Sequence, residues 1–108
     1  MIDNNNFPEE VKKLAKRAEC YATCAYEILS KPKHSAKLPL AIGYISCGLS
    51  YVTNVRSILL AHPNTGNNEL LGFLDYFEDF SDTALMFVNG NKTIEDLESA
   101  YASTQGLL

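Results

Sequence analysis

The feature that most constrains the fold is a segment of 24 residues, Leu38–Ala61, with a single charged residue, Arg56. A segment of this length and hydropathy is long enough to cross a membrane. However, serine, threonine and asparagine dilute its hydropathy, Arg56 is a costly charge inside a span, and no aromatic belt brackets it. We therefore expect no membrane insertion and predict a central, nearly fully buried helix over residues 36–62.

Three faces can be distinguished on this helix by the helical repeat. Two seams of mainly apolar residues indicate that it serves two interfaces. The helix carries more apolar surface than three neighbouring helices in a small monomer would cover. We therefore predict a homodimer through the seam that contains Tyr44, Tyr51, Val55 and Ile58. The remaining face carries small residues, Gly43, Ser46, Ser50 and Ser57, that would let another helix approach closely.

Amphipathic helices are predicted on both sides of the apolar segment. Residues 8–30 carry apolar side chains at steps of three and four, from Val11 through an alanine-rich stripe to Leu29. After the breakers Pro63 and Gly66, four phenylalanines share one face of a helix that ends near residue 89. A short fourth helix, residues 94–104, follows Gly90 and a capping box formed by Thr93 and Asp96.

Four helices with short connections predict antiparallel neighbours in space. The sequence therefore predicts an all-α fold: an antiparallel, up-and-down four-helix bundle of three long helices and a short C-terminal one. A dimer of this bundle is a further hypothesis. At 108 residues the chain is expected to form one domain over residues 1–108.

Charge is unevenly distributed along the chain, whose net charge is −4. Residues 1–37 carry seven of the nine basic side chains against five acids, and residues 38–108 carry two against eight. Such a chain is a poor candidate for nucleic-acid binding, which draws its affinity from neutralising phosphates. A basic protein partner is the better expectation.

An acidic row on the third predicted helix is the candidate binding surface for that partner. Its members lie at i, i+3, i+4 and i+7, so they share one helix face: Asp75, Glu78, Asp79 and Asp82. Such a row can also be only a solvated face, a cation site or an acid–base pair. No histidine accompanies it in the Glu-x-x-His spacing of di-iron bundles, so we predict no metal and no cofactor.

The cysteines Cys20, Cys24 and Cys47 form neither a CxxC motif nor a metal-finger spacing, even with His34 or His62 added. We expect reduced thiols that serve as small apolar side chains. Residues 1–7 lack the basic and apolar regions of a signal peptide, so a cytoplasmic location is expected.

Arg56 and His62 have an Arg-x5-His spacing near the end of a helix, which resembles the Arg-x4-6-His signature of HEPN-type ribonucleases. The resemblance implies a dimer that cleaves RNA without metal, with His62 in acid–base work and Arg56 stabilising charge on the phosphate. The structural alternatives are an Arg56 guanidinium paired with a carboxylate or with a helix C-terminus, and a His62 that caps its helix.

These observations favour a small, acidic, cytoplasmic protein-binding module without enzymatic activity. It would regulate or neutralise a basic partner through the acidic row, in the manner of an immunity protein, antitoxin or inhibitor. The alternatives are the HEPN-like ribonuclease and a structural component whose only activity is self-association.

Overall fold

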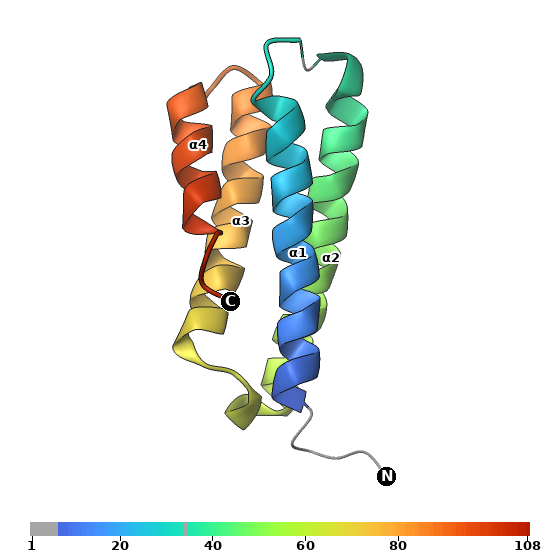
Figure 1. Cartoon of the computed structure of the whole chain (residues 1–108), viewed down its shortest axis with the longest axis vertical. Helices are drawn as coiled ribbons and strands as arrows, with labels where there is room; N and C mark the ends of the chain where they lie inside the picture. The colour runs from blue at the N-terminus through green and yellow to red at the C-terminus, as the bar shows by residue number, and fades with distance from the viewer. Residues whose placement is uncertain (1–6, 34) are drawn as a thin grey trace.

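The computed structural model describes residues 7–33 and 35–108, and this part of the chain is helical, without strands. Four helices pack against one another (Figure 1). They are α1 (Phe7–Leu29), α2 (Leu38–Ala61), α3 (Asn68–Val88) and α4 (Ile94–Ser103), with single 3₁₀ turns η2 (Ser35–Lys37) before α2 and η3 (Pro63–Thr65) after it. The all-α prediction is confirmed. Most of the segment expected to lack a signal peptide (residues 1–6), and His34, lie outside the described residues.

The first helix, α1, contacts α2, α3 and α4. Its core-facing residues are the predicted stripe, with Val11, Ala15, Ala18, Ala22 and Ala25 fully buried. Four alanines on one stripe keep side chains short, so neighbouring helices can approach the α1 backbone closely. The amphipathic prediction for this helix is therefore confirmed.

The prediction that the apolar helix is central and nearly fully buried is wrong. In α2, five residues are buried, Ala41, Ile45, Gly48, Val52 and Val55, and the helix packs mainly against α1 and α3. The segment Ser35–Ala61 is long and apolar enough to cross a membrane by length and composition. Only 28% of its apolar stretch is buried inside the structure. Hydropathy depends on the type of each side chain and not on how many neighbours the helix has. It therefore led to the wrong prediction that α2 is nearly fully buried.

The large side chains of the core come from α3. Phe73, Phe77 and Phe80 are fully buried, as their shared stripe predicts. Phe77 lies against α2 at Gly48, where a Cβ atom would stand 2.9 Å from Phe77 Cε2 and closer still to Cζ. The glycine is therefore required here for close packing of α2 on α3.

Local signals set the ends of the last two helices. Asn67 caps α3 by accepting a hydrogen bond from the Leu70 amide through its Oδ1, at 2.8 Å. Gly90 follows α3 with φ +80, a conformation that favours glycine. At α4 the predicted capping box is present: the Thr93 amide donates to Asp96 Oδ2 at 3.0 Å, and the Asp96 amide donates to Thr93 Oγ1 at 3.2 Å.

Candidate partner-binding face

The acidic row lies on the outward side of α3, and all four carboxylate residues, Asp75, Glu78, Asp79 and Asp82, are exposed. The opposite side of the helix is held in the core by the phenylalanines. Because helix register fixes both sides together, burying the phenylalanines necessarily turns these carboxylates to solvent.

Arg56 of α2 divides this row into two pairs. Its Nη2 donates to Asp75 Oδ1 and its Nε to Glu78 Oε1, each at 2.8 Å. These bonds, Asp75 first, raise the pKa of Arg56 above its ordinary value against the opposing effect of burial. The predicted pairing of Arg56 with a carboxylate is confirmed.

The other two carboxylates remain available for a partner. Within residues 7–33 and 35–108, no basic side chain forms an ion pair with Asp79 or Asp82. Among the described residues, the charge of these two carboxylates is therefore not neutralised by an ion pair.

Exposed apolar side chains bracket the acidic row, a feature that the sequence analysis missed. Leu71 is 45% exposed, Leu85 43% and Met86 45%. Leu71 and Leu85 continue the row at the same spacing, because positions 71, 75, 78, 82 and 85 are separated by steps of four and three. That spacing was the signal available in the sequence. The outward face of α3 is thus acidic in the middle and apolar at its ends, and we name Leu71, Asp79, Asp82, Leu85 and Met86 the α3 outer face.

Arg56 and His62, the two residues of the Arg-x5-His spacing, both make contacts that stabilise the fold. Besides the Arg56 pairing, His62 is the residue that caps α2, and its backbone amide donates to the Ile58 carbonyl oxygen at 2.8 Å. The capping interpretation of His62 is confirmed. A phosphate approaching Arg56 would have to displace two carboxylates, so this geometry does not favour the nuclease chemistry that the HEPN resemblance implies.

The residues predicted to form the dimer interface make contacts within one chain. The rings of Tyr44 and Tyr51 lie 6.0 and 5.9 Å from the ring of Tyr21 on α1. Arg17 Nη1 donates to the Tyr51 hydroxyl at 3.2 Å, which raises the pKa of Arg17. Val55 is fully buried and Ile58 is half-buried against the core. Val55 therefore has no surface to offer a second copy.

The cysteines are free thiols, exposed at Cys20 and Cys47 and half-buried at Cys24. In the part of the chain that the structure describes, no three His, Cys, Asp or Glu side chains come together as metal ligands would.

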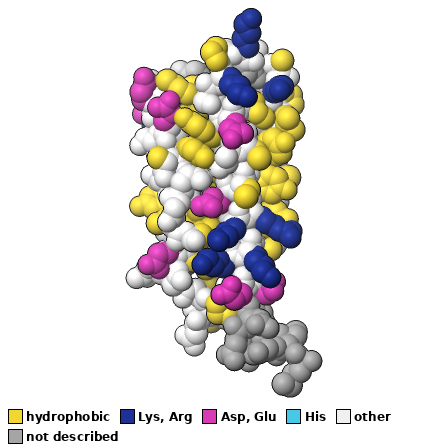
Figure 2. Space-filling model, in the orientation of Figure 1, with side chains coloured by type: hydrophobic (Ala, Val, Ile, Leu, Met, Phe, Trp, Pro, Cys, Tyr) yellow, Lys and Arg dark blue, Asp and Glu magenta, His cyan; other side chains and the backbone are white. Residues whose placement is uncertain are grey.

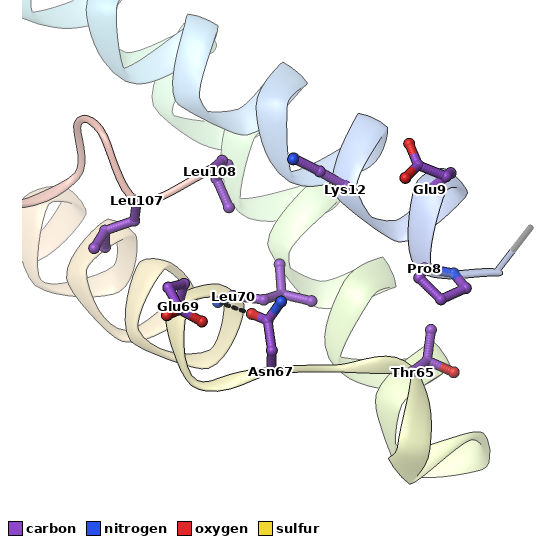
Figure 3. Close-up of a pocket in the computed structure, with 9 residues that line it drawn as sticks. All are labelled: Pro8, Glu9, Lys12, Thr65, Asn67, Glu69, Leu70, Leu107 and Leu108. Carbon is purple, nitrogen blue, oxygen red and sulfur yellow. Dashed lines mark hydrogen bonds between the residues drawn. The ribbon is translucent and has the colours of Figure 1, made fainter.

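A pocket of about 360 Å³ lies where the start of α1 meets the start of α3 (Figure 3). Leu70 and the C-terminal residues Leu107 and Leu108 contribute apolar lining, and Glu9, Lys12 and Glu69 are its charged residues. The Asn67 side chain in this pocket is already engaged as the cap of α3. The sequence analysis did not anticipate this pocket, because its wall combines segments from both ends of the chain.

The chain matches no protein-family model, no curated protein and no solved structure.

Proposed function

We propose that the chain is a small protein-binding module that regulates or neutralises a basic partner through the α3 outer face. The observation that carries this proposal is the combination of Asp79 and Asp82, which have no cation partner among the described residues, with the exposed apolar side chains around them. A helix face that contacts only water needs charged side chains but no exposed apolar ones. A face that adds leucine and methionine at its ends also offers apolar area to bury.

The two components would act at different stages of binding. Complementary charge steers a basic partner toward the face and disfavours acidic competitors. Burial of apolar side chains stabilises the complex after contact, at roughly 25 cal/mol per Å². We infer further that the module is an up-and-down four-helix bundle in the cytoplasm; its short connections and the packing of α1 and α3 against the other three helices support the bundle.

The experiment compares three versions of the chain as bait in an extract of the native host. The test variant is Asp79→Lys with Asp82→Lys, which leaves the Arg56 ion pairs in place. The control variant is Glu95→Lys with Glu98→Lys, which makes the same change of net charge on exposed positions of α4. Circular dichroism establishes that both variants keep their helicity.

The expected result is a basic protein recovered by the wild type and by the α4 variant but not by the α3 variant. Binding of that purified protein should weaken as salt is raised, because the contact depends on exposed charges. Recovery by all three versions would show that the α3 outer face is not the binding site. Loss from both variants would show that only net charge matters, and would also contradict the proposal.

A further inference from the structure

The outward side of α2 has no charged residue. Twelve of its 24 residues are exposed, and all twelve are uncharged. On α1, by contrast, seven of the nine exposed residues that the structure describes are charged. A helix face that meets only water is normally charged or strongly polar. The outward side of α2 therefore has the composition of a covered surface, although none of the described residues covers it.

Small side chains form the middle of this surface, and larger apolar ones form its edges. The middle, which we name the α2 seam, repeats at steps of three and four and comprises Gly43, Cys47, Ser50, Asn54 and Ser57. At Gly43 no atom lies within 4 Å of where a Cβ would stand. Among the edge residues, Leu40 is 48% exposed and Leu60 is 83% exposed. Small residues at heptad spacing let a second helix approach along the whole length of the seam.

The two sides of the α2 seam carry opposite charge. On the α1 side, Lys16 and Arg17 line a hollow together with Tyr51 of α2. Lys13 lies one turn before Arg17 on the same helix and pairs with Glu10 at 3.8 Å. Figure 2 shows basic side chains gathered over the lower part of α1, below a column of apolar side chains along the right edge of the view. On the α3 side lie Asp75 and Glu78, which hold one cation, Arg56. One side is thus net positive and the other net negative.

Both charged sides flank the same stretch of α2. Arg17 contacts Tyr51, and the carboxylates of α3 contact Arg56. Positions 51 and 56 are five residues apart, which is about 7.5 Å along a helix. The basic and acidic groups therefore lie at nearly the same level of the molecule, on opposite sides of an uncharged seam.

We propose that a second copy of this chain covers the α2 seam, with the two-fold axis parallel to α2. Rotation about such an axis exchanges the two sides without changing the level, so the basic side of each copy meets the acidic side of the other. A two-fold axis perpendicular to α2 would instead place basic against basic and acidic against acidic. Charge complementarity therefore selects both the occupant and the symmetry.

The outward side of α2 alone is too small for a stable interface, so the interface must also include the charged sides on α1 and α3. A 24-residue helix is about 36 Å long and about 10 Å wide, so the outward side of α2 supplies only about 360 Å². A standard interface buries about 800 Å² on each partner. The remainder has to come from α1 and α3, which is why the charges there decide how two copies pair.

The first test measures the mass of the whole chain by sedimentation over a wide concentration range. We expect a dimer, and we expect Ser50→Glu, which buries a charge in the middle of the seam, to give a monomer of unchanged helicity. The matched control is Ser99→Glu on the exposed side of α4, which should remain dimeric. A wild type that stays monomeric, or that sediments with membranes, overturns the proposal. So does a dimer that Ser50→Glu leaves intact.

The second test distinguishes the two symmetries and needs no destabilising substitution. In a chain with Cys20, Cys24 and Cys47 replaced by serine, one cysteine is introduced by Gly43→Cys or by Ser57→Cys. With the axis parallel to α2, each variant forms a disulfide with its own copy under mild oxidation. With a perpendicular axis through the middle of the seam, only a mixture of the two variants cross-links. Self-cross-linking of both variants is the expected result, and cross-linking of the mixture alone would overturn the proposed symmetry. Neither test alters Asp79 or Asp82, so this proposal and the proposed function can fail independently.

Discussion

The rings of Tyr26 on α1 and Tyr101 on α4 stack face to face, with centroids 4.1 Å apart and an interplanar angle of 2°. The Tyr101 hydroxyl also forms a hydrogen bond of 3.0 Å with Thr23 Oγ1 of α1. These two contacts attach the short α4 directly to α1.

Substitutions at Tyr101 should separate the contribution of the ring from that of the hydroxyl. Tyr101→Phe keeps the stack and loses the hydrogen bond, at an expected cost of about 1 kcal/mol. Tyr101→Ala removes both, and truncation of a large aromatic side chain costs about 3 kcal/mol. Urea denaturation measures the free energy of unfolding of each variant, and equal losses in both would contradict this assignment.

The two glycines of α2, the exposed Gly43 and the buried Gly48, should respond to alanine in opposite directions. At Gly48 a methyl group would collide with the Phe77 ring, so Gly48→Ala should destabilise the chain by about 1–3 kcal/mol. At Gly43 there is open space, so Gly43→Ala should gain up to about 1 kcal/mol from helix propensity. Thermal denaturation at low protein concentration compares the two variants. A Gly48→Ala variant as stable as the wild type or more stable would show that Phe77 moves aside.

Stability should fall at acid pH partly through Asp96. Hydrogen bonding from the Thr93 amide, and then its hydroxyl, lowers the pKa of Asp96 below its ordinary value. A carboxylate with a lowered pKa stabilises the fold above its unfolded pKa, near about 3.9, and this contribution is lost as the pH falls through the lower, folded value. The free energy of unfolding should lose this pH-dependent component in Asp96→Asn, measured from pH 6 to pH 2. An unchanged pH profile would contradict the role of the capping box.

The Arg56 ion pairs should contribute only modestly to stability. The Arg56 side chain is 36% exposed, and those of Asp75 and Glu78 are 76% and 48% exposed. Solvent screening at such positions limits each pair to about 0.5 kcal/mol. A double-mutant cycle of Arg56→Ala with Glu78→Ala measures the coupling, and a value of several kcal/mol would mean that this cluster is far less hydrated than its exposure indicates.

Reversal of the charges beside the α2 seam should weaken self-association. Lys13→Glu with Lys16→Glu places acid against acid in the proposed dimer, and a few surface pairs of this kind amount to about a tenfold increase in Kd. Adding Asp75→Lys and Glu78→Lys to the same chain should restore the dimer, because the two sides are then opposite again. If the combined variant dimerises still more weakly, the basic side of one copy does not face the acidic side of the other. Sedimentation equilibrium measures the dimer Kd of the wild type, the double variant and the combined variant.

The helices and their ends could be predicted from the sequence because the signals are local. The alanine stripe, the phenylalanine stripe, Gly90 and the capping box at Thr93 each act within a few residues. The long helices end within two residues of where they were expected, although residues 35–37 form the separate turn η2 rather than the start of α2.

The arrangement of the helices could not be predicted in the same way. Low charge indicated that α2 lies at the centre, yet α1 and α3 each contact the three other helices, whereas α2 packs mainly against α1 and α3. The pairing of Arg56 was expected, but its partners lie 19 and 22 residues away, and no local pattern identifies them. That pairing also divides the acidic row, so the α3 outer face emerges only from tertiary structure.

The alanine stripe of α1 has a consequence for how the chain tolerates change. At Ala15, Ala18, Ala22 and Ala25 the side chain is fully buried, and any larger residue would push a neighbouring helix away. A saturation mutagenesis scan should therefore find its least permissive positions among the smallest side chains of the chain, while the outward positions of the same helix accept almost any polar residue.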